Sequence, residues 1–180
     1  MKAVLISIRL KYVSLIRSGK KTIEIRKTKP ANINVPFKCY IYQTLPKYGD
    51  INNFDGKVVG EFICNKIEQI DLQSAVNYNL CKKSCLSYSD LIEYAKNKIN
   101  LYGWCITDVK MYDTPKRLDE FYKWTGDKDI RPCQNSKHCN EEYYDYSEDV
   151  RACRIDFDGD NCPFLRVQRP PQSWQYIDIN

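Results

Sequence analysis

The chain has 180 residues, of which 43% are hydrophobic and 13% aromatic, a composition typical of a folded domain and not of a disordered segment. Its length suits one domain with a real core. No apolar run approaches the roughly 18 residues of a membrane span, and the N-terminal MKAVLISIRL is too short and too soon charged for a signal peptide. We therefore expect a cytoplasmic protein without a membrane partner.

The net charge of +5 conceals an uneven distribution. Residues 1–139 carry a net charge of +10, residues 140–162 carry −6, and the last eighteen residues carry +1. The basic part is suited to attract phosphates. The acidic segment would repel phosphates or cover the basic surface of the same chain. The alternative is that both charged runs are ordinary solvent-exposed surface without a binding role.

The chain opens with a β–α–β pattern. Apolar residues alternate over 2–9, recur at helical spacing over 10–18 and alternate again over 22–27. Gly19 is expected to end the helix, since glycine is the usual residue just beyond a helix C-terminus.

The same alternation predicts further strands. Gly60, inside the longest of them, indicates a bulge or bend. Residues 71–88 are expected to form a loop with a short helix. Many strands with few short helices favour an α+β domain built on a small β-barrel or a strongly bent sheet. The further strands are predicted at 37–44, 57–70, 102–113 and 174–179.

Two helices are predicted in the second half of the chain. One covers 89–99 with Ser89 as its N-cap. The other covers 114–124, with Thr114 as N-cap and Pro115 in the first turn. The buried stripe of the first helix is expected to consist of Leu91, Ala95 and Ile99.

Several catalytic chemistries lack their residues. The chain has neither a GxxxxGK[ST] nor a GxGxxG motif, so a phosphate-cradling loop has no support. Its one histidine, His138, excludes an HExxH metal site and would have to carry any Ser–His–Asp or Cys–His site alone.

Residues 125–165 show no periodicity and form an acidic, cysteine-rich segment with four of the nine cysteines. These four thiols, with His138 as a substitute ligand, suffice for one tetrahedral structural zinc. The alternative is a set of reduced cysteines, as a reducing cytosol would keep them. The candidate zinc ligands are Cys133, Cys139, Cys153 and Cys162.

The stretch SGKKTIEIRK, at 18–27, contains the most informative pattern. Residues 9–29 hold eight Lys or Arg and a single acid, Glu24. Strand alternation places Glu24 and Arg26 on one face, with Lys21 at the start of the strand. The carboxylate could form a surface ion pair, accept hydrogen bonds from a ligand such as a base edge, or act as a base beside a lysine.

Other residues are suited to complete a ligand cleft around this strand. Ser7 and Arg9 share one face of the first strand, which would lie near Lys21 if the first two strands are neighbours. A polar residue after two prolines, Gln172, could read a base edge. Trp104 and Trp174 are candidates to stack on a base, the alternative being that both are ordinary core residues.

The run Gly19–Arg26, GKKTIEIR, resembles the G-x-K-x-x-E-x-R signature of the ASCH (activating-signal-cointegrator homology) family, in the PUA-like superfamily. YGW at 102–104 and RPPQSW at 169–174 resemble the phage and bacterial branch of that family. The resemblance covers roughly 1–124 and 166–180. It implies a single domain over 1–180, built on a five- or six-stranded β-barrel with flanking short helices and interrupted by the irregular Cys-rich insertion at 125–165.

The resemblance also implies a function. It suggests a module that binds RNA, DNA or a modified nucleoside in a Lys/Glu/Arg cleft, with no required cofactor beyond the candidate zinc. One alternative is an enzyme in the same cleft, either an N4-acetylcytidine-type amidohydrolase or a ribonuclease, with Lys21 and Glu24 as catalytic residues. In the amidohydrolases of the family a threonine takes the position held here by Glu24. A second alternative is a protein-interaction adaptor that docks its partner through the insertion.

Overall fold

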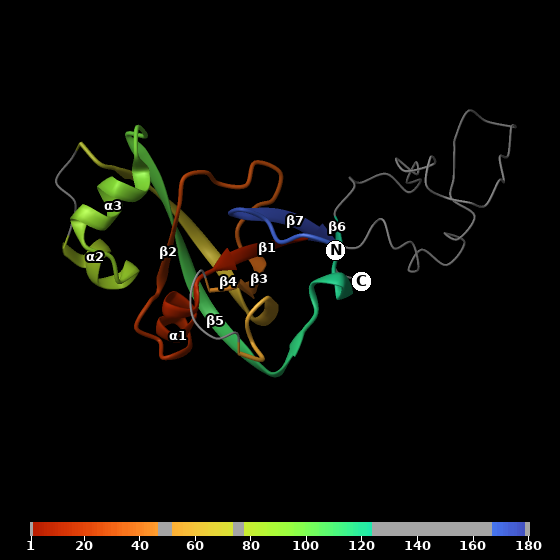
Figure 1. Cartoon of the computed structure of the whole chain (residues 1–180). Coiled ribbons are helices and arrows are strands. Elements are labelled where there is room, and N and C mark those ends of the chain that lie inside the picture. Colours follow the sequence, from red (N-terminus) through yellow and green to blue (C-terminus); the bar gives the residue numbers. More distant parts are fainter. Residues whose placement is uncertain (1, 47–51, 74–77, 124–166, 179–180) are drawn as a thin grey trace, which may run out of the picture.

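The computed structural model describes residues 2–46, 52–73, 78–123 and 167–178. Over these residues seven strands form one mixed sheet in the order β2-β5-β4-β3-β1-β7-β6, with three α-helices and a short 3-10 helix (Figure 1). The elements are β1 (Lys2–Ile8), α1 (Leu10–Arg17), β2 (Ile23–Arg26), β3 (Phe37–Gln43), β4 (Lys57–Asp71), α2 (Tyr78–Ser84), α3 (Tyr88–Ala95), β5 (Asn100–Lys116), η1 (Leu118–Glu120), β6 (Tyr122–Lys123) and β7 (Trp174–Asp178).

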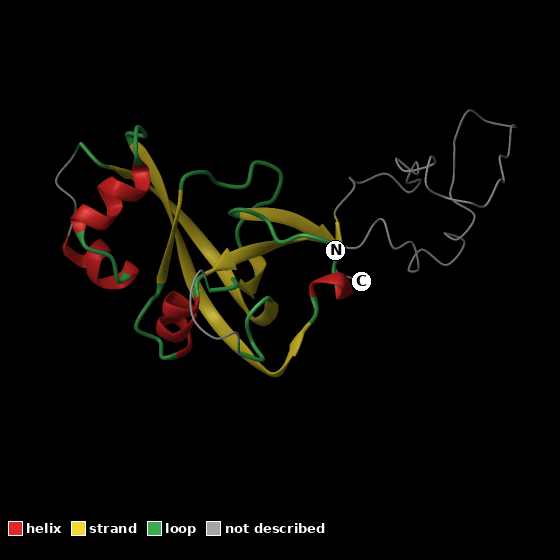
Figure 2. Ribbon diagram, viewed as in Figure 1, coloured by secondary structure: helices red, strands yellow, loops and turns green. Residues whose placement is uncertain are grey.

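The sheet is curled but does not close into a barrel. β2 and β6 stand at its two ends, and in the described part of the chain they do not pair with each other. The α+β class is therefore confirmed, whereas the predicted closed barrel is wrong. The two end strands have only four and two residues, too few to complete a ladder, while β4 and β5 extend over 15 and 17 residues. Figure 2 shows these two long strands crossing the molecule with a strong twist.

The bulge predicted at Gly60 is present. The register of β4 against β3 shifts between Ile41 and Tyr42, and its register against β5 shifts between Val58 and Gly60. A Cβ atom at Gly60 would lie 2.6 Å from the backbone oxygen of Lys110. Glycine is needed here because the backbones of β4 and β5 approach too closely for any side chain.

The strands β1 and β3 are buried on both faces. In β1, Val4 and Ile6 face one apolar cluster, which α1 covers through Val13 and Ile16. The alternate residues of β1 face a second cluster, which the segment around Phe121 covers. The alternation expected over 2–9 therefore does not separate a buried from an exposed face, because Ala3 to Ile8 are all buried between the two clusters.

A third cluster lies beneath α2 and α3, which sit together at one end of β4 and β5 (Figure 1). The N-cap of α3 is Ser87 and not the predicted Ser89, because the Ser87 hydroxyl accepts from the Asp90 backbone and the Asp90 carboxylate accepts from the Ser87 backbone in return. Leu91 and Ala95 are buried as expected, but Ile99 is 53% exposed because α3 ends before it. No helix in the described ranges has the length and apolar character to span a bilayer.

The helix predicted at 114–124 is wrong. β5 continues through this region to Lys116, and only η1 and the two-residue β6 follow. Pro115 is tolerated because β2 pairs with β5 only over Tyr102–Cys105, so the strand at Pro115 needs no N–H for that neighbour. A Thr-Pro pair followed by polar residues occurs both at the start of helices and at the end of strands such as β5. The pattern alone therefore does not distinguish the two.

Candidate functional site

The strand β2 brings the predicted charged residues together. Ile23 and Ile25 enter the cluster beneath α2 and α3, so Glu24 and Arg26 face the opposite side. Across the ladder Glu24 pairs with Trp104 of β5. The alternation predicted from TIEIRK is therefore confirmed, and it is what aims both charged groups in one direction.

Lys21, Glu24 and Arg26 form a compact buried ion cluster, hereafter the charged triad. Glu24 Oε2 lies 3.3 Å from Lys21 Nζ, and Glu24 Oε1 lies 3.0 Å from Arg26 Nη2. The three residues are only 2%, 7% and 6% exposed. A surface ion pair, one of the interpretations left open by the sequence, is thereby excluded.

Lys21 is held from two further sides. Its Nζ donates a hydrogen bond of 2.6 Å to the backbone oxygen of Ser84, at the end of α2. It also lies 5.1 Å from the ring centre of Tyr12, on α1. The ammonium group thus has a carboxylate, a carbonyl and an aromatic face as neighbours, which compensates for its burial.

Arg26 joins β2 to the first strand and to the segment before β7. Its Nη2 donates to the backbone oxygen of Ser7 at 2.7 Å, and its Nη1 to the Ser173 hydroxyl at 3.4 Å. The Ser7 hydroxyl itself donates to the Pro171 oxygen at 2.6 Å. The first two strands are not neighbours in the sheet, and Ser7 contacts the triad at Arg26 and not at Lys21. It does so through its backbone carbonyl, because its hydroxyl is already used.

The other predicted ligand-binding residues differ in accessibility. Arg9 and Gln172 are exposed. Trp104 is 0% exposed, since Phe37 and Trp174 pack against its ring, so it is a core residue and offers no face to a base. Trp174 is partly exposed and donates its Nε1 to the Thr28 hydroxyl at 3.1 Å. It is the tryptophan of the pair that a ligand can reach.

Two tyrosines at the site were not predicted. Tyr12 lies over Lys21, and burial together with the charges of Asp90 and Glu24 raises the pKa of its hydroxyl. Tyr94 of α3 is 36% exposed; burial raises the pKa of its hydroxyl, and the neighbouring Arg26 guanidinium offsets part of that rise. Both belong to helices, and no spacing in the sequence links them to the strand they flank.

Several buried polar atoms of this region have no hydrogen-bond partner among the described residues. Glu24 Oε2 has the ion-pair contact with Lys21 but no directed hydrogen bond. Arg26 Nε and Trp104 Nε1 are likewise unpartnered. Since unsatisfied buried polar groups are rare in folded proteins, Glu24 Oε2 and Arg26 Nε are candidate contacts for a polar ligand, whereas Trp104 is enclosed in the core.

The predicted metal site falls elsewhere. Cys133, Cys139, Cys153, Cys162 and His138 lie outside the described residues, so the zinc site stays a prediction. Within the described ranges no group of three or more His, Cys, Asp or Glu side chains is arranged to hold a metal ion. Cys39 and Cys64 of the sheet are buried free thiols.

Comparison with known proteins identifies the fold. Neither protein-family models nor curated protein sequences gave a match. Three crystal structures of ASCH from the bacterium Zymomonas mobilis are similar, each at 23% sequence identity. A serine-to-alanine mutant of that protein covers 65% of this chain and 75% of its own with a TM-score of 0.53. A tyrosine-to-phenylalanine mutant covers 66% and 78% at 0.53, and the unmutated protein 65% and 74% at 0.51.

A sequence identity of 23% supports a shared fold and nothing finer. That fold agrees with the resemblance of the run GKKTIEIR to the ASCH signature. The chain has the fold of an ASCH domain.

Proposed function

We propose that the protein binds RNA or a modified nucleoside, with the charged triad as the part of the site that recognises the base. The observation that carries this proposal is the buried Glu24 Oε2, which has a lysine beside it but no hydrogen-bond donor directed at it among the described residues. An ion cluster kept only for stability would gain the fold little, because the desolvation of buried charges offsets most of their attraction.

The chemistry of the triad fits a base edge. A carboxylate accepts hydrogen bonds from the exocyclic amino group of a base, and a guanidinium donates to ring nitrogen or carbonyl oxygen. Glu24 Oε2 and Arg26 Nε are buried and unpartnered among the described residues, so both are available for such contacts. A ligand edge with a donor next to an acceptor would satisfy them together.

A ligand would have to approach the buried triad between its aromatic neighbours. Tyr12 lies over Lys21, Tyr94 is adjacent to Arg26, and Trp174 lies on the β7 side. Each is partly or largely exposed. A base that displaces one tyrosine ring can stack on another aromatic side chain, a contact worth about 1–3 kcal/mol.

The surface around the site is basic. Lys27 and Lys29, just after β2, lie 5.0 and 5.7 Å from the ring centres of Tyr94 and Tyr102. Positive charge interleaved with aromatic rings suits a nucleic-acid strand, with phosphates on the cations and bases on the rings. Further exposed cations of the same N-terminal segment are Arg9, Lys11 and Lys20.

The test compares Glu24→Gln with Glu61→Gln. Both carboxylates pair with a lysine, Glu61 at 3.0 Å from Lys38, but Glu61 stands opposite Tyr40 in the ladder, on the side of the second apolar cluster. Binding of short RNA, DNA and a panel of nucleosides that includes N4-acetylcytidine is measured by calorimetry, and each mixture is analysed for products. We expect saturable binding that Glu24→Gln weakens at least about tenfold and Glu61→Gln leaves unchanged.

The other outcomes have definite meanings. Product formation that is lost in both Lys21→Ala and Glu24→Gln would make the site an enzyme, either an amidohydrolase or a ribonuclease. Equal binding by the two Gln variants would contradict the proposed site. Absence of binding to every nucleic acid, with a protein partner captured only when 125–165 is intact, would favour the adaptor.

A further inference from the structure

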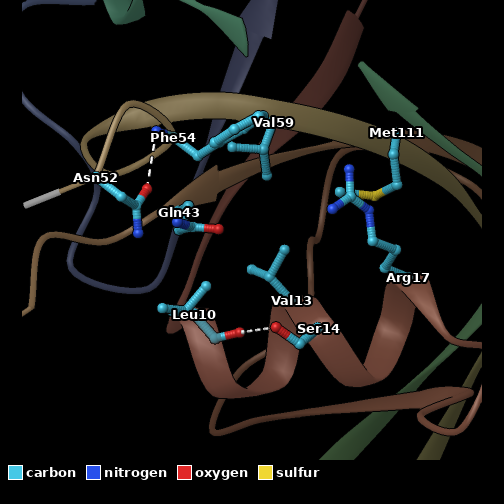
Figure 3. Close-up of a pocket in the computed structure, with 9 residues that line it drawn as sticks. All are labelled: Leu10, Val13, Ser14, Arg17, Gln43, Asn52, Phe54, Val59 and Met111. Carbon is cyan, nitrogen blue, oxygen red and sulfur yellow. Dashed lines mark hydrogen bonds between the residues drawn. The ribbon is translucent and has the colours of Figure 1, made fainter. Parts of the chain in front are cut away.

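A second concave site lies on the other side of α1, away from the charged triad. It is a pocket with a volume of about 120 Å³ between α1, the end of β3, the loop before β4, and the strands β4 and β5 (Figure 3). None of its lining residues belongs to the triad. The lining consists of Leu10, Val13, Ser14, Arg17, Gln43, Asn52, Phe54, Val59 and Met111.

The middle of this pocket is largely apolar. Leu10 and Val13 lie three positions apart on α1, so the helix face that they share forms one wall. Val59 and Met111 form the opposite wall. The volume of about 120 Å³ is somewhat below that of a cavity of about 150 Å³ known to hold a benzene ring, so the pocket admits at most one ring.

One end of the pocket carries a fixed hydrogen-bonding pair. Gln43 is 2% exposed and its Nε2 donates to Asp55 Oδ1 at 2.8 Å, which orients the amide and leaves its oxygen as an acceptor. Figure 3 shows that oxygen directed toward the side of Val13. Asn52 uses its Oδ1 to accept from the backbone N–H groups of Phe54 and Asp55, which leaves its side-chain NH₂ as a donor.

The opposite end carries a cation. Arg17 lies in the last turn of α1, and its guanidinium extends beside Met111 (Figure 3). Within the described ranges it forms no ion pair or side-chain hydrogen bond, in contrast to Arg26 and Arg117. The cation and the amide pair lie at opposite sides of the pocket, with Val13 and Val59 between them (Figure 3).

We propose that this pocket binds a small aromatic monoanion, with the ring between α1 and the sheet, the carboxylate on Arg17, and a hydroxyl or amino donor on Gln43 at the far end. The apolar walls and the small volume limit the body to one ring. Arg17 selects the charge and the buried Gln43 oxygen selects the donor. This ligand is chemically different from a nucleic acid, and its site is independent of the function proposed for the triad.

The test uses 4-hydroxybenzoate as the probe, with benzoate and phenol as partial probes that each lack one polar group. Binding to the full chain is followed by protein-observed NMR and calorimetry. We expect 4-hydroxybenzoate to bind best and each partial probe to bind at least about fivefold more weakly. Arg17→Gln should weaken 4-hydroxybenzoate about tenfold or more, because a charge-assisted hydrogen bond is lost.

Two more variants locate the binding. Ser14 is exposed and its hydroxyl bonds only the Leu10 carbonyl of its own helix, so Ser14→Phe fills the pocket without breaking another contact. This variant should abolish binding, whereas Lys11→Gln, which removes a cation from α1 outside the pocket, should leave it unchanged. The proposal is overturned if 4-hydroxybenzoate does not saturate below about 10 mM, if phenol or benzoate binds equally well, or if binding survives Ser14→Phe or Arg17→Gln.

Discussion

Arg26 donates through Nη2 to the backbone oxygen of Ser7 at 2.7 Å, although three strands separate β2 from β1 in the sheet. The contact is a side-chain bridge between two strands that are not hydrogen-bonded neighbours in the sheet. The guanidinium thereby serves the fold and the candidate site at once, because the same group also pairs with Glu24.

Removal of this guanidinium is expected to destabilise the protein. Arg26→Ala leaves the Glu24 carboxylate buried with one cation fewer and should lower the free energy of unfolding by about 3 kcal/mol, the usual result of breaking a buried ion pair. Urea titration followed by circular dichroism measures the change. Arg117→Ala is the control, since its ion pair with Asp119 is exposed and should contribute nothing measurable. Equal effects of the two substitutions would show that the Ser7 contact does not hold the sheet.

Gly60 and Gly19 are both required, but for different reasons that substitutions can separate. At Gly60 a Cβ would meet a backbone oxygen at 2.6 Å, so Gly60→Ala should destabilise the protein by about 2 kcal/mol. Gly19 has open space around it but a φ of +70°, so Gly19→Ala should cost about 1 kcal/mol. Asparagine tolerates positive φ, so Gly19→Asn should recover most of that loss while Gly60→Asn should not. Thermal and urea denaturation of all four variants gives the comparison.

The thiol of Cys64 is expected to resist alkylation in the folded protein. Burial raises its pKa to about 12, so at pH 8 the reactive thiolate is a fraction on the order of 10⁻⁴. Peptide mapping after iodoacetamide treatment should find Cys81 and Cys85, which are partly exposed, modified well before Cys64. The raised pKa of Cys64 also makes the free energy of unfolding depend on pH. The contribution of the buried, protonated thiol is fully present below the pKa that the thiol has in the unfolded chain, and it is lost as the pH rises from there toward about 12. Early modification of Cys64 at pH 8 would contradict its burial.

Salt dependence distinguishes a nucleic-acid strand from a nucleoside as ligand. Affinity for a short RNA should fall as salt rises, with a slope of about −0.7 per phosphate contact in a plot of log affinity against log salt. Replacement of Lys27 and Lys29 together by Ala should make that slope shallower by about 1.4, while Glu24→Gln should lower the affinity at every salt concentration without changing the slope. Nucleoside binding should hardly depend on salt. A slope that is unaffected by the double substitution would place the phosphates elsewhere.

The local pattern of the sequence predicted most strands because two-residue alternation is read directly from the residues. It failed at Thr114 and Pro115, where the ladder with β4 extends a strand that local propensity would end. It also failed at Ser89, because several serines precede α3 and only the reciprocal bonds of Ser87 and Asp90 decide between them. Closure of the sheet was beyond prediction, since it depends on bulges and end-strand lengths that act through tertiary pairing.

The candidate site was predictable in part. The run GKKTIEIR indicated the triad because Lys21, Glu24 and Arg26 lie within six consecutive positions, on one strand and the turn before it. The roles of Ser84, Tyr12 and Tyr94 depend on how helices pack against that strand, and nothing in their spacing indicates it. Trp104 illustrates the opposite error, because an aromatic residue near a ligand site reads the same in the sequence whether it faces the ligand or the core.

The ties between the triad and the last described segment have a consequence for the order of folding. The Ser7–Pro171 hydrogen bond joins residues 164 positions apart, and the Arg26–Ser173 bond joins residues 147 apart. Such contacts form late, because closing a long loop must precede them. During synthesis from the N-terminus, β1, α1 and β2 emerge long before residues 171–173 do. The triad therefore reaches its final arrangement only after the ribosome has released this segment, so an incomplete chain would not present a finished binding site.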